Sequence, residues 1–136
     1  MEKAVGPKAG RMITPHFSWQ EARCRCGCEI PEELYPNIVR MAQVAERVRA
    51  EVGGPMFVTS WYRCPEYNAK VGGAPNSFHL KGLAIDFVVK NIPARQVQQI
   101  CAKLQDRGVF GGLGRYPGHT HIDLGPKRTW EGGYKV

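Results

Sequence analysis

The sequence predicts an α+β fold, a small and mainly antiparallel sheet backed by helices. Residues 31–52 and 93–107 carry apolar side chains at three- and four-residue spacing, as amphipathic helices packed on a core do. Short runs rich in β-branched and aromatic residues lie between and after these stretches, bounded by Gly, Pro and Asn, and they indicate strands. Two helices and several short strands in one chain of 136 residues predict a single helix-backed sheet.

The N-terminal part is expected to hold a flexible arm, residues 1–13, followed by one short helix. Ser18 and Glu21 match a capping box, and Phe17 stands in the hydrophobic-staple position before it. We therefore expect a helix that begins at about Trp19 and ends near the cysteine cluster.

The two amphipathic helices carry start and stop signals. Pro31 suits the first turn of the long helix, and the glycine pair at 53–54 suits its end. Pro93 is placed to open the second helix, and Gly108 is placed to stop it.

Strands are predicted over residues 55–60, 83–89, 109–113 and 119–124. The loop over residues 65–76 contains Pro, Asn and Gly, with room for a turn of helix near its start. No repeat or low-complexity segment interrupts the chain. Residues 14–130 are therefore expected to form one domain, with residues 131–136 as a C-terminal tail.

Composition limits the classes of function. An apolar content of 43% and a charged content of 23% are ordinary for a globular protein, and no run approaches the roughly 18 apolar residues of a membrane span. The net charge of +7 favours attraction to polyanions. Because the Lys and Arg residues are scattered and no nucleic-acid-reading motif is present, neither nucleic acid nor a membrane is expected as a partner.

The five cysteines are an odd number, which argues against a complete disulfide framework. Cys24, Cys26 and Cys28 alternate, and thiolates at this spacing, with Cys64 as a fourth ligand, could hold a structural metal. The spacing differs from the C-x-x-C of ordinary zinc knuckles. The sequence therefore favours a Cys-rich turn of free thiols over a second metal site, and it places Cys101 in the core on the apolar face of a helix.

Histidines and carboxylates form the most informative pattern in the chain. His79 precedes Asp86, and His119 and His121 follow some thirty residues later. Imidazole nitrogen plus carboxylate is a ligand set that a catalytic Zn²⁺ uses when a fourth position stays open for water. Side chains alternate along a strand, so His119, His121 and Asp123 share one face. If the strands over 83–89 and 119–124 are neighbours, Asp86 and His121 can meet, and His79 can complete three ligands.

Five pieces of the chain form one linked set of motifs. They are Phe17-Ser18-Trp19-Gln20-Glu21 with the Cys-rich stretch, Ser60-Trp61-Tyr62-Arg63, Val71-Gly72-Gly73-Ala74, Ser77-x-His79-x-x-Gly82-x-Ala84-x-Asp86 and His119-x-His121-x-Asp123-x-Gly125. In this set, residues 17–130 resemble the zinc D-alanyl-D-alanine carboxypeptidases, peptidoglycan metallopeptidases related to the hedgehog amino-terminal domain. The resemblance implies the zinc fold of the hedgehog and D,D-peptidase proteins, and we expect a monomer.

The same resemblance implies roles for individual residues. The ligands of one catalytic Zn²⁺ are His79, Asp86 and His121. Arg63 matches an arginine that faces the substrate or the developing oxyanion. Many relatives carry an acidic general base three residues before the last ligand, where this chain has Gly118. His119 is then the expected base, or else an electrophile that stabilises the oxyanion.

Two side chains are candidates for substrate contact, Ser77 and Tyr116, beside Arg63. Asp123, on the histidine face of its strand, is expected to orient a ligand.

The resemblance implies a zinc-dependent peptidase that hydrolyses peptide bonds of the peptidoglycan stem peptide through a zinc-activated water. It would act as a D-Ala-D-Ala carboxypeptidase or as a wall endopeptidase of the lysin type. The alternative, favoured by the missing acid at Gly118, is a non-catalytic hedgehog-like module in which zinc stabilises a binding fold. No signal peptide is recognisable, so we expect synthesis in the cytoplasm and action on the cell wall after lysis or holin-type release.

Overall fold

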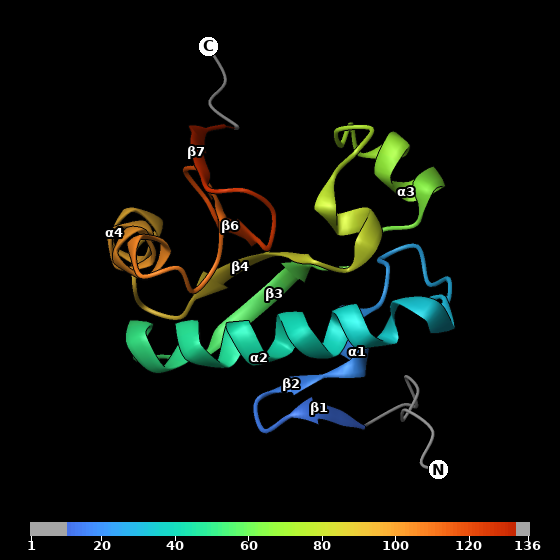
Figure 1. Ribbon diagram of the computed structural model, residues 1–136, viewed down its shortest axis with the longest axis horizontal. Helices are drawn as coiled ribbons and strands as arrows, with labels where there is room; N and C mark the ends of the chain where they lie inside the picture. Colours follow the sequence, from blue (N-terminus) through green and yellow to red (C-terminus); the bar gives the residue numbers. More distant parts are fainter. Residues whose placement is uncertain (1–10, 133–136) are drawn as a thin grey trace.

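The centre of the structure is a five-stranded sheet, seen in a computed structural model that describes residues 11–132. Its strands, in spatial order, are β3 (Met56–Ser60), β4 (Ala84–Val89), β6 (Thr120–Asp123), β5 (Gly112–Arg115) and β7 (Arg128–Glu131). Neighbouring strands run antiparallel except for β5 and β7, which are parallel. The expected α+β fold with a mainly antiparallel sheet is therefore confirmed (Figure 1).

Two long helices pack on the sheet, α2 (Tyr35–Val52) and α4 (Ala94–Asp106). Figure 1 shows α2 running along one side of the sheet, with the hairpin of β1 (Met12–Thr14) and β2 (Phe17–Ser18) on the far side of that helix. Within residues 11–132, no helix has the length and apolar character that crossing a bilayer requires.

The shorter helical segments include α1 (Trp19–Ala22), α3 (Pro65–Lys70) and a 3₁₀ turn at Phe78–Lys81. The predicted capping box of α1 is present, because the Ser18 hydroxyl accepts the N–H of Glu21 while the Glu21 carboxylate accepts the N–H of Ser18.

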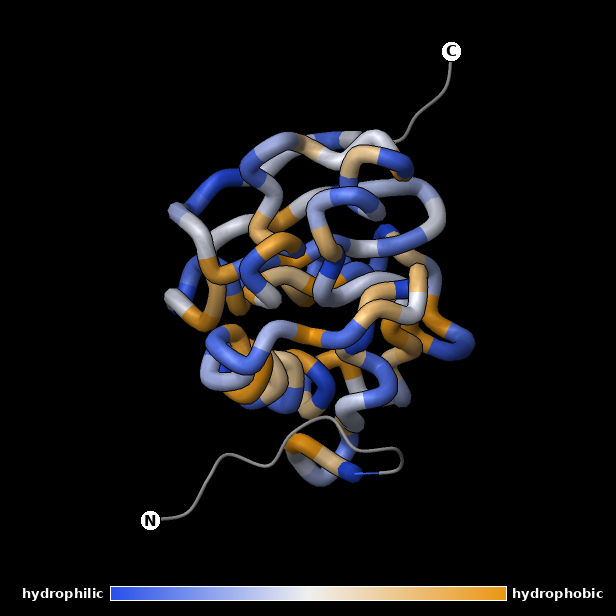
Figure 2. Tube along the Cα trace, turned by 90° about the vertical axis from the view of Figure 1, so that its right-hand side faces the viewer, coloured by the Kyte–Doolittle hydropathy of each residue, from blue (hydrophilic) through white to orange (hydrophobic). Residues whose placement is uncertain are grey.

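One face of the sheet builds the core. Ile85 of β4 pairs with Ile122 of β6, which in turn pairs with Leu113 of β5, and all three are buried. They belong to one apolar cluster with Met41 of α2 and Val97 of α4. Figure 2 shows the hydrophobic segments gathered in the interior of the trace. Cys101 of α4 is fully buried in the same cluster, as expected.

The opposite face of the same strands carries polar side chains. Because residues alternate between faces, the register that turns Ile85 inward turns Asp86 outward, directly opposite His121. Asp123 stands opposite Ala84 on this face, and glycines at 112 and 114 of β5 stand opposite Asp123 and His121. One sheet therefore supplies the core on one side and a polar site on the other.

Several boundaries differ from the sequence-based expectation. The long helix is preceded by a 3₁₀ turn at Glu32–Leu34, because Pro36 has no N–H to continue α-helical bonding to the carbonyl of residue 32. The strand expected at 109–113 lies instead at Gly112–Arg115. Two of its four residues are glycines, which are uncommon inside strands, so the sequence did not indicate these bounds.

The expected terminal segments also need revision within the described residues. Met12 and Ile13 were expected in the arm but belong to β1, paired with β2. Glu131 was expected in the tail but ends β7, a strand whose polar sequence carries little strand signal. The remainder of the arm, residues 1–10, and residues 133–136 of the tail lie outside the described residues.

Candidate active site

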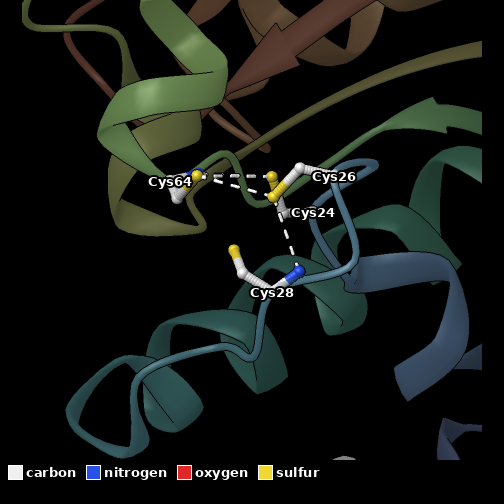
Figure 3. A group of neighbouring side chains, drawn as sticks. All are labelled: Cys24, Cys26, Cys28 and Cys64. Atoms are coloured by element: carbon white, nitrogen blue, oxygen red, sulfur yellow. Dashed lines mark hydrogen bonds between the residues drawn. The ribbon is translucent and has the colours of Figure 1, made fainter.

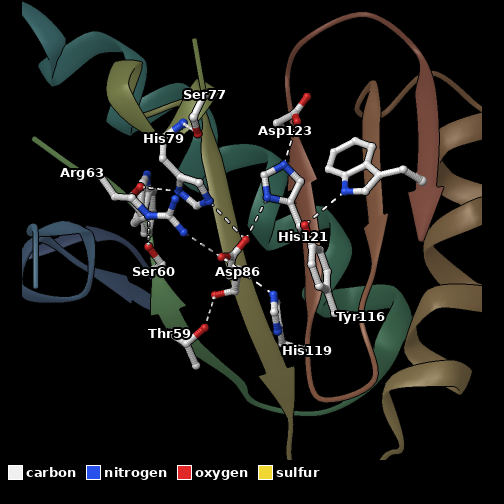
Figure 4. A network of polar contacts seen from close by, with 12 residues as sticks. Thr59, Ser60, Arg63, Ser77, His79, Asp86, Tyr116, His119, His121 and Asp123 are labelled. Carbon is white, nitrogen blue, oxygen red and sulfur yellow. Dashed lines mark hydrogen bonds and ion pairs between the residues drawn. The ribbon is translucent and has the colours of Figure 1, made fainter. Parts of the chain in front are cut away.

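A cavity of about 670 Å³ lies over the polar face of the sheet. Its lining includes all the candidate catalytic, metal-binding and substrate-contacting residues of the sequence analysis, namely Arg63, Ser77, His79, Asp86, Tyr116, His119, His121 and Asp123. These side chains come from segments separated by up to sixty residues. Figure 4 shows Arg63, His79, His119 and His121 around the Asp86 carboxylate, with Ser77, Tyr116 and Asp123 farther out.

Three side chains meet at the floor of the cavity. The Oδ1 atom of Asp86 lies 2.8 Å from Nδ1 of His121 and 3.2 Å from Nε2 of His79. All three residues are buried, and their ligand atoms lie within 4.8 Å of one another. The structure therefore brings together the three zinc ligands that the sequence suggested, and their role as ligands stays a prediction.

The second nitrogen of each ring is already engaged by an acceptor. Nδ1 of His79 lies 2.6 Å from the backbone carbonyl of Trp61, which can only accept, so this nitrogen carries the proton. Nε2 of His121 lies 2.7 Å from Oδ2 of Asp123, so it carries the proton of the ring whenever Nδ1 turns a lone pair to a cation beside Asp86. In a neutral imidazole the other nitrogen is then a lone pair, and both lone pairs face Asp86.

This arrangement explains why the residues fit a cation. Two imidazole lone pairs and a carboxylate oxygen all point at one another, with no proton among them in the neutral-ring state. Burial alone would raise the pKa of Asp86, but its contacts with His121 and His79 hold it far below its usual range, so the carboxylate is charged. Two neutral nitrogens and one carboxylate are a zinc-type ligand set.

Asp123 holds the far side of His121. It is fully buried, and its two oxygens accept parallel hydrogen bonds of 2.9 Å from Nη1 and Nη2 of Arg128. Hydrogen bonds from His121 and Arg128, again working against burial, lower the pKa of Asp123 to about 2. A carboxylate behind a ligating histidine fixes the ring orientation and raises its basicity. The expected orienting role of Asp123 agrees with this geometry.

Arg128 was missed by sequence reasoning. It comes from β7, whose parallel pairing with β5 places it opposite Gly112. A Cβ atom at Gly112 would meet the Asp123 carboxylate and the Arg128 guanidinium at 2.3–2.5 Å, so only glycine leaves room for this pair. The sequence does carry one signal for this pair, the glycines at 112 and 114, which pair with the His-x-Asp of β6 and leave space beside it.

Arg63 lies at the opposite wall of the cavity and donates to three different side chains. Its Nε lies 3.0 Å from Ser60 Oγ, its Nη1 lies 3.1 Å from Asn68 Oδ1 and its Nη2 lies 3.3 Å from Asp86 Oδ2. Arg63 therefore braces a predicted ligand directly. Asn68, a buried residue of α3 that sequence reasoning also missed, is itself fixed by donating to the carbonyl of Ala74.

His119 is near the three converging residues without belonging to them. Its Nε2 lies 3.9 Å from Asp86 Oδ2, and its ring stacks on Tyr116 with centroids 4.3 Å apart. The ring is partly buried, and this desolvation lowers the pKa of His119. It reaches the cavity as an imidazole with its nitrogens available to water or substrate.

The other two candidates for substrate contact have structural partners as well. Ser77 lines the cavity while its hydroxyl accepts the N–H of His79, so it caps the turn that presents this histidine. The hydroxyl of Tyr116 accepts the indole N–H of Trp130 at 3.1 Å. Both remain candidates for contact with a bound ligand.

Two histidines and an aspartate, converging on the polar face of a helix-backed and mainly antiparallel sheet, fit a metallopeptidase, and comparison with known families gives the same class. Residues 15–123 match the family described as Peptidase M15. The chain belongs to this family.

Individual relatives are similar over the part of the chain that carries the site. The chain is 43% identical over 63 residues to a Haemophilus influenzae protein named as a probable peptidoglycan L,D-endopeptidase MepK. It is 32% identical over 83 residues to the peptidoglycan L,D-endopeptidase MepK of Escherichia coli K12. These matches cover 45% and 56% of this chain but only 32% and 43% of the relatives, so the chain spans less than half the length of either.

Proposed function

We propose that this protein is a zinc-dependent peptidase that cleaves peptide bonds of the peptidoglycan stem peptide. The observation that carries the proposal is the convergence of two imidazole lone pairs and the Asp86 carboxylate at the floor of a cavity large enough for a peptide. The names of the two relatives support the same substrate class.

The residues that would hold the metal are His79, Asp86 and His121. A zinc ion held by these residues would supply a Lewis acid, which can polarise a peptide carbonyl and make a water molecule acidic enough to lose a proton near neutral pH. Asp123 and the carbonyl of Trp61 keep the two imidazoles in the tautomers that this role requires.

His119 is the proposed general acid–base. In hydrolysis, water adds a hydroxyl to the carbonyl carbon while the bond to nitrogen breaks, and one proton must pass from the water to the leaving amine. Among the residues that line the cavity, the carboxylates are Asp86 and Asp123, and both are tied to histidine and arginine. His119 alone among these titratable groups faces the cavity with a nitrogen free to accept that proton and return it.

We further propose cleavage within the stem peptide rather than removal of its last residue. A carboxypeptidase site needs a cation to bind the terminal carboxylate of the substrate. The two arginines that line the cavity are Arg63 and Arg128, and each guanidinium already holds a carboxylate of the protein itself. This favours an endopeptidase over a D-Ala-D-Ala carboxypeptidase, the two activities that the resemblance left open, and it agrees with the names of the relatives.

The proposed place of action is the cell wall, after release from the cytoplasm. The net charge of +7 favours attraction to anionic wall polymers.

The test is incubation of the zinc-loaded protein with purified peptidoglycan and with synthetic stem peptides, followed by mass spectrometry of the products. We expect internal cleavage products, and none from the double variant His79→Ala/His121→Ala. Release of only the terminal D-alanine would reverse the choice between endopeptidase and carboxypeptidase. Retention of the peptide without any product would instead support a binding module.

A further inference from the structure

A second cluster of metal-binding side chains lies away from the cavity. Cys24, Cys26 and Cys28 follow α1, and Cys64, forty residues after the first of them, is the N-cap residue of α3. Their four sulfur atoms lie within 4.8 Å of one another. Figure 3 shows the four side chains gathered between the two segments. All four are free thiols, and the cluster shares no residue with the histidine–aspartate site.

The distances from the sulfur of Cys64 to those of Cys24 and Cys26 fit tetrahedral coordination. Sγ of Cys64 lies 3.8 Å from that of Cys24 and 3.7 Å from that of Cys26. In a tetrahedron with zinc–sulfur bonds of about 2.3 Å, neighbouring sulfurs are about 3.8 Å apart. A disulfide would need a sulfur separation of about 2.05 Å and would pair two cysteines at a time, which leaves the gathering of four unexplained.

A turn explains how alternating cysteines can point to one centre. The N–H of Gly27 donates to the carbonyl of Cys24, and Gly27 has φ of +93°, a conformation that strongly favours glycine. This turn breaks the alternation that an extended C-x-C-x-C segment would have. The unusual spacing, which counted against a metal when the sequence was considered alone, is therefore compatible with one.

The surroundings of the cluster suit negatively charged sulfur. Three of the sulfur atoms accept a backbone N–H, each with a nitrogen-to-sulfur distance of 3.4 Å. The N–H of Cys28 donates to Cys26, that of Cys64 donates to Cys24 and that of Tyr67 donates to Cys64. Four thiolates around a divalent ion leave a charge of −2, and the same loop carries two arginines. Arg23 and Arg25 both donate to backbone carbonyls of the loop and its neighbours, Arg25 reaching Val58 of β3.

We propose that Cys24, Cys26, Cys28 and Cys64 bind a structural Zn²⁺ ion through four thiolates. Four protein ligands leave no position for water, so this site holds the fold and takes no part in hydrolysis. It links the loop after α1 to the segment that follows β3. That segment contains Trp61, whose carbonyl orients His79, and Arg63, which holds Asp86. By fixing this segment, the ion would stabilise the positions of Trp61 and Arg63, and through them those of His79 and Asp86.

Metal content tests this without reference to peptidase activity. Zinc-loaded protein is freed of excess metal, and zinc per chain is measured by mass spectrometry of the metal. We expect two ions in the wild type, one in His79→Ala/His121→Ala, one in Cys26→Ser/Cys28→Ser and two in Cys101→Ala. The last variant is the matched control, because it also removes a thiol but from the core of α4.

A cobalt spectrum keeps the test decisive if the cysteine variant does not fold. Cobalt-loaded His79→Ala/His121→Ala should show thiolate-to-cobalt charge transfer and the intense visible bands of a tetrahedral thiolate complex. No bound metal in this histidine variant, or bound cobalt without charge transfer, would overturn the proposal. So would wild-type zinc content in a folded Cys26→Ser/Cys28→Ser protein, or a metal-free protein with a disulfide within the cluster.

Discussion

Nε2 of His121 lies 2.7 Å from Oδ2 of Asp123, and this contact decides which nitrogen of the ring faces Asp86. The carboxylate also accepts two parallel hydrogen bonds from Arg128 and the N–H of Gly125. Every partner of Asp123 is thus a donor. Asp123 acts on the predicted metal only through His121, and it has no direct contact with His79 or Asp86 among its hydrogen bonds.

Replacing Asp123 by Asn should weaken metal binding at the cavity. Both oxygens of Asp123 accept hydrogen bonds, so the NH₂ group of asparagine would face a donor instead of an acceptor. The set of hydrogen bonds that fixes the tautomer of His121 would then be lost. We expect a drop in zinc affinity of roughly 10- to 100-fold, the scale seen when such supporting groups are changed. Competition with a chromophoric chelator measures it.

Asp106→Asn is the control for this substitution. Asp106 is an exposed acid of α4 that pairs with Lys127 at 3.1 Å, so its loss should leave zinc affinity unchanged. Equal affinity in Asp123→Asn and the wild type would show that His121 keeps its tautomer without the carboxylate.

His119→Ala should separate proton transfer from metal binding. The ring lies beside Asp86 but outside the three converging ligands, so the cavity should retain its zinc. If His119 carries the proton to the leaving amine, kcat should fall by roughly 10²-fold or more. Zinc content and turnover measured on the same preparation check both expectations.

His16→Ala is the matched control for the loss of an imidazole. His16 pairs with Glu46 outside the cavity, and its removal should not change kcat. An unchanged kcat in His119→Ala would assign the proton transfer to another group.

The meeting of Asp86 with His121 could be predicted from sequence alone. Alternation along two strands puts both side chains on one face, and the structure pairs the two residues directly across β4 and β6. His79 needed only the short 3₁₀ turn before β4 to reach them. Local periodicity was sufficient here because the three residues lie on or beside neighbouring strands.

The supporting residues could not be predicted in this way. Arg128 reaches Asp123 only because β7 pairs in parallel with β5, and the sequence Arg-Thr-Trp-Glu has too few apolar residues to indicate a strand. Cys64 joins three cysteines that lie about forty residues earlier, a long-range contact without any periodic signal. Sequence patterns specify the strands, whereas these contacts depend on how distant segments pack.

Glu46→Gln should lower stability in a pH-dependent way. The carboxylate accepts the backbone N–H of His16 at 2.7 Å and lies 2.8 Å from its ring Nδ1, which ties the β1–β2 hairpin to α2. Burial alone would raise the pKa of Glu46, but the hydrogen bonds from His16 lower it below the ordinary value. We expect a loss of about 1 kcal/mol in the free energy of unfolding at neutral pH.

The sign of the pH effect follows from this lowered pKa. A carboxyl group with a lowered pKa in the folded state stabilises the fold above its ordinary pKa, about 4.3, and loses that contribution as the pH falls through the folded value. The difference in melting temperature between wild type and Glu46→Gln should therefore shrink below about pH 4. Glu51→Gln, which removes an exposed pair with Arg107 at 3.9 Å, should show little difference at any pH.

Arg63→Lys tests the geometry of a guanidinium that donates to three acceptors. The nitrogens of Arg63 reach Ser60, Asn68 and Asp86 at once, and the single ammonium group of lysine cannot span all three. Asp86 would then lose a donor that holds it in place. We expect the protein to remain folded and to keep its zinc while kcat/KM falls about tenfold or more, the equivalent of one charge-assisted hydrogen bond.

The comparison with Arg63→Ala and Arg107→Lys completes this test. Arg107 is exposed, so its replacement by lysine should change neither kcat/KM nor the melting temperature. Arg63→Ala removes all three contacts and should lower both quantities. If Arg63 only neutralised the charge of Asp86, the ammonium of lysine would serve nearly as well, and near-wild-type kcat/KM in Arg63→Lys would refute the requirement for a planar donor at this wall of the cavity.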